Sequence, residues 1–298
     1  MIKTTHNSKA KWISARTYSV GASESPVLFG KGYKDQTPLT VYQKKVAPSP
    51  NDNSDNESMM LGRYLEPGIR SAFAAREGLK VDEPLNWTSY YAPDQPRISA
   101  TPDGFVHEGI NRGCLEIKYV ANQYDQWADG APDRVWIQLQ QQMFVTGLLF
   151  GWIAAVIGGE LHTSRHERDD AFCLRLRQAV EKFWKLVECR EEPIATAYEC
   201  DSVALTRLHP DDNGQIMHLD KPEDLLKYGQ FLASRSHAKE ADENKTALKN
   251  YFKARIGDNS YGRLPDGRGF SLKTHDKFYK AREARTSKAR PLLVCESL

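Results

Sequence analysis

Two strand-like segments, residues 98–104 and 114–119, are joined by a short turn, and this hairpin constrains the fold more than any other feature. The glycine and asparagine residues between the segments are typical of a tight turn. Because alternate side chains of a strand project from the same face, Glu116 and Lys118 are expected to point together. The hairpin then places Asp103, near the end of the first segment, beside them.

These three charged side chains suit metal-dependent phosphodiester chemistry, while Leu115 and Ile117 are expected to face the core. Two carboxylates offer the hard oxygen ligands that Mg²⁺ or Mn²⁺ prefers. A bound metal lowers the pKa of its water, and Lys118 can hold that water or stabilise charge in the transition state. The alternative is a surface hairpin with three solvated charges. The choice between an active site and such a hairpin therefore depends on other segments of the chain.

Three further segments accompany the hairpin: Trp12 with Arg16 and Gly21–Glu24, then Leu61–Pro67, and finally Gln138–Met143. In this order the four blocks resemble the lambda-exonuclease-like branch of the PD-(D/E)XK nucleases, also called YqaJ-type viral recombinases. The resemblance covers residues 12 to about 190. It implies an α/β fold, a restriction-endonuclease-like mixed sheet flanked by helices.

The resemblance implies a catalytic set of Glu66, Asp103, Glu116, Lys118 and Gln138. It also implies a metal site made by Asp103, Glu116, Ile117 and Glu66, with Mg²⁺ as the cofactor and Mn²⁺ able to substitute. Glu66 precedes Pro67, a residue tolerated in a first helical turn. An ordinary first-turn glutamate, favoured by the helix dipole, is therefore the alternative for Glu66.

The glutamine-rich segment predicts a helix from about Asp133 to Thr146. Its buried stripe is apolar: Val135, Leu139 and Met143. Gln138 and Gln142 lie one turn apart on another face. The resemblance implies that Gln138 orients the attacking water or a phosphate, whereas a solvated helix face explains Gln140 and Gln141 equally well.

Arg16 and Ser23 match the family's pocket for a 5′-terminal phosphate. A guanidinium binds phosphate through two hydrogen bonds, and Ser23 lies at the expected start of a helix over Glu24–Phe29, a natural anion site. Ser23 also suits a plain N-cap. Trp12 either supports Arg16, contacts a terminal base or simply packs in the core.

The composition limits how the chain can attract DNA and which cysteine sites it can form. The formal charge of +2 comes from 41 basic and 39 acidic residues, so attraction to DNA depends on local patches. The five cysteines are scattered and contain no Cys-x-x-Cys pair: Cys114, Cys173, Cys189, Cys200 and Cys295. This spacing argues against structural zinc and an iron–sulfur cluster and favours reduced thiols.

The resemblance and the distribution of turn-forming residues predict a nuclease domain over residues 1–192. A helical extension with a β-hairpin is expected over 193–298. Strands are expected at about 79–91, 97–107, 113–120, 150–157 and 160–166, and helices at about 58–77, 133–147 and 169–190. Residues 48–58 suit a loop, either passive or a flap over DNA. Residues 193–220 look irregular, a helix follows from Pro222 to about Arg255, and a hairpin spans residues 260–273.

The role of the extension stays open between DNA binding and oligomerisation, and its basic stretch Lys273–Arg290 suits either DNA backbone contacts or a solvated tail. The N-terminus has no apolar leader, and no apolar run approaches about 18 residues. We therefore expect no membrane partner and a cytoplasmic location, in a phage-infected or prophage-carrying bacterium if the resemblance holds.

The resemblance implies a Mg²⁺-dependent deoxyribonuclease that degrades the 5′ strand of duplex ends, 5′ to 3′, and leaves 3′ single strands for phage-type recombination. A PD-(D/E)XK DNA endonuclease and a non-catalytic DNA-binding recombination module are the alternatives. The expected partners are double-stranded DNA ends and a single-strand annealing protein, and the resemblance suggests a ring-like homotrimer.

Overall fold

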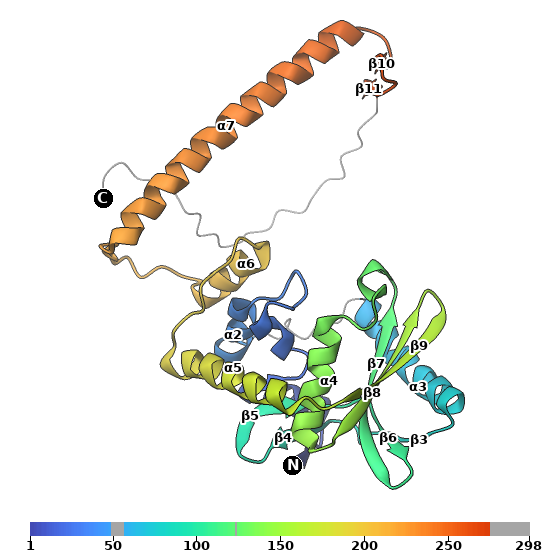
Figure 1. Cartoon of the computed structure of the whole chain (residues 1–298). Coiled ribbons are helices and arrows are strands. Elements are labelled where there is room, and N and C mark those ends of the chain that lie inside the picture. The colour runs from blue at the N-terminus through green and yellow to red at the C-terminus, as the bar shows by residue number, and fades with distance from the viewer. Residues whose placement is uncertain (49–56, 123, 275–298) are drawn as a thin grey trace. The chain divides into compact units, whose positions relative to one another are not determined.

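The structure is a computed structural model that describes residues 1–48, 57–122 and 124–274, and Figure 1 labels its elements in chain order. The chain divides into two compact units, Met1–Pro210 and Asp211–Leu298. The residues 49–56 of the expected loop lie outside the described part, as does most of the expected basic stretch. No helix of the described residues is long and apolar enough to cross a membrane.

A five-stranded mixed sheet forms the centre of the first unit. Its strand order is β3 (Lys80–Asp82), β6 (Gly104–Glu108), β7 (Asn111–Val120), β8 (Phe150–Ile157) and β9 (Glu160–Glu167). Only β7 and β8 pair in parallel, and the other neighbours are antiparallel. The parallel pair requires a crossover, which the helical segment between β7 and β8 provides.

Two helices cover opposite faces of this sheet, α3 (Glu57–Glu77) and α4 (Asp133–Thr146), as Figure 1 shows on either side of β7 and β8. One apolar cluster joins the sheet to α3: Ile69, Phe73, Val106, Leu115, Ile117 and Ala154. A second joins it to α4: Cys114, Val135, Leu139, Met143 and Ile153. The expected core positions of β7 and α4 are therefore confirmed. Since Leu115 and Ile117 face α3, the alternation of the strand turns Glu116 toward α4.

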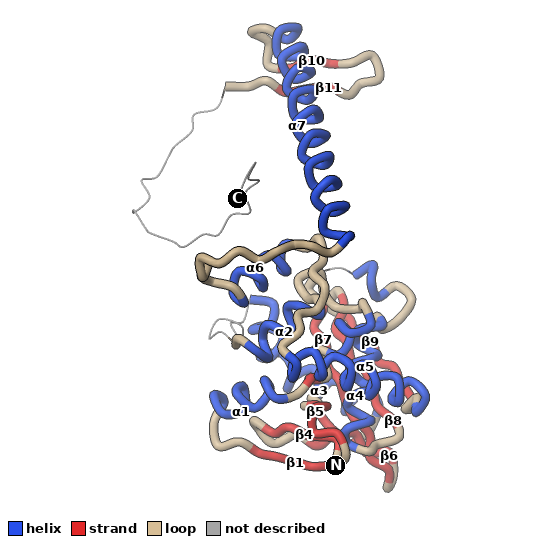
Figure 2. The backbone as a smooth tube through the Cα atoms, turned by 90° about the vertical axis from the view of Figure 1, so that its left-hand side faces the viewer, coloured by secondary structure: helices blue, strands red, loops and turns tan. Residues whose placement is uncertain are grey.

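A smaller four-stranded sheet has the order β1 (Ile2–Thr5), β4 (Thr88–Ala92), β5 (Gln95–Ala100) and β2 (Val20–Gly21). In Figure 2 its strands lie beside helix α1 (Lys9–Ala15), and the indole nitrogen of Trp12 donates a hydrogen bond to the Ser89 hydroxyl at 3.1 Å. The second sheet was not anticipated, because two of its strands are very short.

The predicted continuous strands at 79–91 and 97–107 are wrong. Each is two strands in different sheets, β3 with β4 and β5 with β6. Pro84 and the positive φ of Trp87 (54°) interrupt the first, and Pro102 separates the second pair. Proline lacks the N–H that a ladder needs, so both breaks have a local cause.

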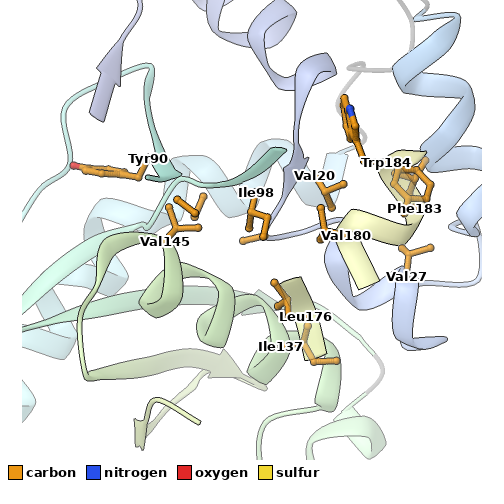
Figure 3. Close-up of a cluster of buried hydrophobic side chains, with 14 of the residues drawn as sticks. Val20, Val27, Tyr90, Ile98, Ile137, Val145, Leu176, Val180, Phe183 and Trp184 are labelled. Carbon is orange, nitrogen blue, oxygen red and sulfur yellow. The ribbon is translucent and has the colours of Figure 1, made fainter. Parts of the chain in front are cut away.

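The largest apolar cluster lies between the smaller sheet and several helices: α2 (Pro38–Val46), α4, α5 (Asp170–Cys189) and the short 3₁₀ turn η2 (Ser25–Phe29). Figure 3 shows Ile98 of β5 beside Ile137 and Val145 of α4, with Leu176 and Val180 of α5 close by. Helix α4 therefore packs on both sheets. It ends at Gly147, whose φ of 74° is a left-handed conformation that glycine adopts without strain.

The first unit extends beyond the predicted boundary at 192 because α6 (Glu199–Leu208) belongs to it. Asp201 is buried, accepts a hydrogen bond from the Thr196 amide at 2.6 Å and another from the Thr37 hydroxyl at the start of α2. The expectation of irregular backbone over 193–220 is wrong for this helix.

The second unit contains α7 (Pro222–Ile256) and a hairpin of β10 (Tyr261–Arg263) with β11 (Gly269–Ser271). The ring centroids of Phe252 and Phe270 lie 4.2 Å apart, and Ile256 is buried. Gly262 lies against Ile256 so closely that an added Cβ would stand 2.7 Å from its side chain. The predicted helix and hairpin are thus confirmed.

Candidate active site

The register of the β6–β7 hairpin fixes Asp103 beside the middle of β7. Asp103 directly precedes β6, and its amide donates to the carbonyl of Leu115 at 3.1 Å. One oxygen of its carboxyl group, Oδ2, accepts the Ile117 amide at 2.8 Å. Gly104 follows at a crowded position, where an added Cβ would stand 3.3 Å from the Leu115 side chain. The chain reversal therefore brings Asp103 next to the Glu116 segment, as expected.

Glu116 is fully buried, and each oxygen of its carboxylate has a donor. Lys118 donates its ammonium to Oε1, and the Gln142 amide donates to Oε2 at 2.5 Å. The Lys118 ammonium also donates to Gln138 Oε1 at 3.1 Å. The structure thus brings Lys118 and Gln138 to Glu116, and it adds Gln142, whose role the sequence reasoning missed.

A solvated helix face does not explain Gln140 and Gln141, since both are fully buried. Gln140 donates to the Glu167 carbonyl at 2.9 Å and accepts the Asp169 amide at 2.8 Å. Gln141 donates to backbone carbonyls on β2 and β5, at 2.9 and 2.8 Å. Because α4 lies between two sheets, these amides satisfy strand and loop backbone that would otherwise be buried without partners.

Glu66 reaches the site from the middle of α3 and forms an ion pair with Arg70 at 2.6 Å. The first-turn alternative is wrong, because α3 begins at Glu57 and carries Pro67 in its interior. Arg70 is buried and also donates from Nε to the Asp103 carbonyl at 3.1 Å. Arg70 was not anticipated, although its spacing of four residues from Glu66 on a helix was a usable signal.

The pKa values of Asp103 and Glu66 both lie above their usual values. Burial raises the pKa of Asp103 well above its usual value, and the negative charges of Glu116 and Glu66 raise it further. Burial also raises the pKa of Glu66, against the opposing effect of Arg70. Burial lowers the pKa of Lys118, but Glu116 and Asp103 outweigh it and the pKa lies above the usual value. A cation bound at this cluster would relieve the repulsion among its carboxylates.

The donor set fits Mg²⁺ or Mn²⁺ better than a metal that needs a protein cage. Among the described residues, no three Asp, Glu, His or Cys side chains come together as a metal-binding group. Asp103 and Glu116 can supply carboxylate oxygens, and Ile117, whose side chain is buried, can supply only its carbonyl. Mg²⁺ keeps several waters and typically takes one or two carboxylates, so this open set suits it. Glu66, held by Arg70, can assist through water.

Arg16 lies with its guanidinium over the Trp12 ring, 5.1 Å from the ring centroid. Trp12 therefore supports Arg16 and is not a simple core residue. Ser23 is exposed, and the expected N-cap role is wrong, because Glu24 occupies the position before the 3₁₀ turn of Ser25–Phe29 and no side chain caps it. The expected helix is only this short turn, so the anion site here depends on side chains more than on aligned backbone N–H groups.

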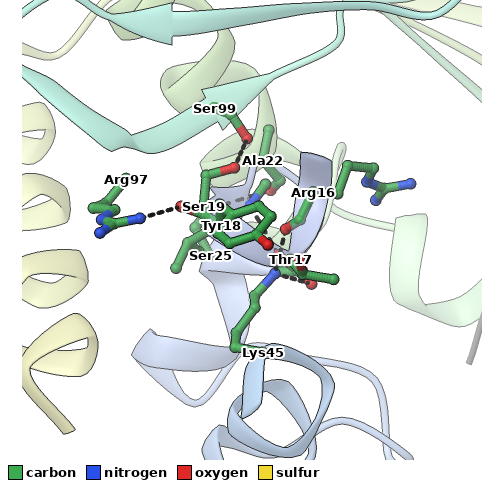
Figure 4. Close-up of polar contacts among 12 residues, drawn as sticks. Arg16, Thr17, Tyr18, Ser19, Ala22, Ser25, Lys45, Arg97 and Ser99 are labelled. Carbon is green, nitrogen blue, oxygen red and sulfur yellow. Dashed lines mark hydrogen bonds and ion pairs between the residues drawn. The ribbon is translucent and has the colours of Figure 1, made fainter. Parts of the chain in front are cut away.

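A buried ion pair fixes the backbone behind Arg16. The Lys45 ammonium donates to both oxygens of Glu24, at 2.7 and 2.9 Å, and to the Arg16 carbonyl at 3.0 Å, and Figure 4 shows Lys45 reaching this carbonyl from α2. Glu24 also accepts the Gly21 amide at 2.8 Å. Burial raises the pKa of Glu24, but Lys45 and Arg16 more than offset this and the pKa lies below its usual value. All three Lys45 protons have partners, so Lys45 positions Arg16.

One cleft of about 790 Å³ joins these groups. Its lining includes residues that are far apart in the chain: Arg16, Ser23, Glu66, Asp103, Glu116, Lys118 and Gln138. The sequence-predicted phosphate pocket and the predicted acidic cluster therefore share a single cavity, and every predicted site residue, Ile117 included, contributes to its lining.

The mixed sheet and its flanking helices confirm the predicted α/β fold, which is of the PD-(D/E)XK type. Residues 11–149 match the family model of the YqaJ-like viral recombinase domain. No curated protein matches the chain.

The chain is similar to solved structures. The crystal structure of LHK-Exo in complex with dAMP has a TM-score of 0.53 and 23% identity, and the match covers 61% of this chain and 94% of that one. LHK-Exo is an alkaline exonuclease from Laribacter hongkongensis, and a second crystal structure of it has a TM-score of 0.49 with the same identity and coverage. A phage-related exonuclease from Haemophilus somnus 129PT is similar at a TM-score of 0.45 and 14% identity, with 57% of this chain and 93% of that one covered. The match to LHK-Exo with dAMP shows a shared fold, and the family match supports a nuclease role.

Proposed function

We propose that the protein is a metal-dependent DNA exonuclease that degrades the 5′ strand of duplex ends and leaves 3′ single strands for recombination. This proposal rests on the single cleft that contains both the acidic cluster around Glu116 and the candidate phosphate site of Arg16 and Ser23, here called the Arg16 pocket. A cavity that holds a terminal phosphate at one place and a scissile phosphodiester at another suits an enzyme that acts at strand ends.

Asp103 and Glu116 would hold Mg²⁺, or Mn²⁺ in its place, and the carbonyl of Ile117 would complete the protein ligands. Bound there, the ion would supply an activated water and neutralise charge on the phosphate. The ammonium of Lys118, fixed between Glu116 and Gln138, stabilises charge that develops on the phosphate oxygens or holds the attacking water. Gln138 orients that ammonium, and Gln142 holds the far oxygen of Glu116.

Arg16 and Ser23 would seat the terminal 5′ phosphate. The guanidinium of Arg16 can form two charge-assisted hydrogen bonds with a phosphate, and its stacking on Trp12 fixes the plane in which they form. The buried Glu24–Lys45 pair keeps the Arg16 backbone in place. A single-strand annealing protein is the partner proposed to take up the 3′ strand.

The decisive experiment compares linear duplexes with a 5′ phosphate or a 5′ hydroxyl, and closed circular duplex, each with Mg²⁺. We expect rapid digestion of phosphorylated ends and end-labelled products released from the 5′ side. Arg16→Ala should slow phosphorylated ends by roughly ten- to a hundredfold, the loss of one charged hydrogen-bonding partner, and erase the preference for them.

Glu116→Gln serves as the inactive control in the same assay, because it removes a proposed metal ligand. Efficient cutting of closed circular DNA, with equal rates on both kinds of linear end, would instead establish an endonuclease. Binding of DNA without any cleavage, with Mg²⁺ or Mn²⁺, would establish a non-catalytic DNA-binding module.

A further inference from the structure

Tyr33 is an exposed aromatic residue in the wall of the cleft that no part of the proposed chemistry uses. It lies in the loop between η2 and α2, and 48% of its surface is exposed. The guanidinium of Arg134, in the first turn of α4, lies over one face of its ring at 4.7 Å from the ring centroid. Both residues line the same cavity as Asp103 and Lys118.

The loop that carries Tyr33 is fixed on both sides of it. Lys31 forms an ion pair with Asp133 of α4 at 2.7 Å. Gly32 has no room for a side chain, since an added Cβ would stand 2.9 Å from Val27. The Gln36 amide donates to the Tyr33 carbonyl at 2.9 Å. Tyr33 is therefore held in place before any ligand arrives, which lowers the entropy cost of binding.

Arg134 supports the ring rather than an acidic neighbour. Its Nε is buried and has no hydrogen-bond partner in the part of the chain that the structure describes. The contact of the Arg134 guanidinium with the Tyr33 ring is a cation–π interaction. It strengthens stacking on the other face of the ring and adds positive charge to the cleft wall. An exposed ring next to a cation matches the two halves of a nucleotide, a flat base and an anionic phosphate.

Tyr33 also shares the cleft with the reacting groups, since Glu116 and Gln138 line the same cavity. An aromatic residue in this wall can meet the base of a nucleotide that is bound in the cleft, whatever that base is. Stacking of this kind tolerates any sequence, because every base has a π face.

We propose that Tyr33, supported by Arg134, forms a stacking subsite for the base of the strand-end nucleotide beside the acidic cluster. This subsite rests on the part of the proposed function in which DNA occupies the cleft. It requires the aromatic ring of Tyr33 and makes no use of the hydroxyl group, so phenylalanine should replace tyrosine there.

The test measures equilibrium binding of 5′-phosphorylated duplex by fluorescence anisotropy in EDTA, where cleavage does not interfere. One duplex is intact, and a second has abasic residues at the first three nucleotides of the 5′ strand. We expect the wild-type protein to bind the intact end about tenfold more tightly than the abasic end, the scale of one base–aromatic stack. Tyr33→Leu should bind both ends equally, and Tyr33→Phe should keep the wild-type difference.

Tyr198→Leu is the matched control, because Tyr198 is similarly exposed, at 55%, and lies outside the cleft lining. It should behave as the wild type. The subsite is overturned if Tyr33→Leu still distinguishes the two ends, or if the wild type does not distinguish them. Cleavage with Mg²⁺ is measured separately, so absence of cleavage with intact base discrimination would remove the proposed exonuclease and leave the subsite standing.

Discussion

The carboxylate of Glu116 is held on both oxygens, by an ammonium on one side and an amide on the other. A buried charge without such donors would cost several kcal/mol. The Gln142 amide therefore has a clear function even though it does not line the cleft. It fixes the orientation of Glu116 from the side of the helix. Lys118 and the space in front of Asp103 then remain available to the substrate.

Replacing Gln142 with methionine should lower turnover roughly ten- to a hundredfold while leaving DNA binding intact, because Glu116 loses a charge-assisted hydrogen bond. Single-turnover kinetics and anisotropy separate the two effects. Gln141→Met is the matched control, since Gln141 is equally buried on the same helix but binds backbone carbonyls. It should reduce stability and leave turnover per folded molecule near wild type. Equal loss of turnover in both variants would contradict the positioning role.

Asp103 has a raised pKa in the folded protein, so its folded form binds a proton more tightly than its unfolded form does. The free energy of unfolding should therefore fall as pH rises from the usual range of an aspartic acid through the raised value. Asp103→Asn removes this group, and in EDTA at neutral pH it should melt at a higher temperature than the wild type.

Thermal melts across pH, with and without Mg²⁺, check this expectation. Asp129→Asn is the control, because Asp129 is exposed and should leave the melting temperature unchanged. Mg²⁺ should stabilise the wild type and not Asp103→Asn, since the ion binds only where both carboxylates are present. A lower melting temperature for Asp103→Asn in EDTA would show that the acidic cluster is not strained.

At the scale of elements, the sequence predicted β7 and α4 well, because each has an unambiguous period: alternation around Glu116, and the apolar stripe of Val135, Leu139 and Met143. It could not show that α4 lies between two sheets, which is why Gln140 and Gln141 looked solvated. The contact of Arg70 with Asp103 joins residues far apart in the chain. Such a contact depends on tertiary packing and leaves no periodic signal.

The packing of α4 on β8 makes a prediction about this element. Gly151 in β8 faces Leu139 so closely that an added Cβ would stand 2.7 Å from its side chain and 3.1 Å from the Cys114 carbonyl. Gly151→Ala should push α4 away, cost about 1–3 kcal/mol of stability and lower turnover, because α4 carries Gln138 and Gln142.

Chemical denaturation and kinetics of the folded protein measure both effects of Gly151→Ala. Gly68→Ala is the matched control, since Gly68 lies inside α3 with nothing within 4 Å of an added Cβ. Alanine there should stabilise the helix by about 0.5–1 kcal/mol. If Gly151→Ala were as stable and active as the wild type, α4 would not depend on this close approach.

At the scale of the whole molecule, all the proposed site residues lie in the first unit, Met1–Pro210. This unit has its own apolar core. Helix α6 is attached to it by the buried Asp201 carboxylate, which accepts hydrogen bonds from Thr196 and Thr37. The second unit has a long helix whose apolar residues are largely exposed, among them Leu225, Leu226, Tyr228 and Leu248. The net charge of +2 gives no strong attraction to DNA over the whole molecule.

A chain that ends at Pro210 should therefore fold cooperatively and digest phosphorylated duplex ends, because it keeps both the acidic cluster and the Arg16 pocket. Circular dichroism melts and the end-labelled assay check folding and activity, with Glu116→Gln in the shortened chain as the inactive control. The ring-like homotrimer that the resemblance suggests is tested on both chains by analytical ultracentrifugation. If the second unit carries the oligomer contact, the shortened chain should sediment as a monomer and lose processivity on long duplexes while its initial rate on short ones persists. A shortened chain that melts cooperatively but cuts no ends would show that the extension contributes directly to the site.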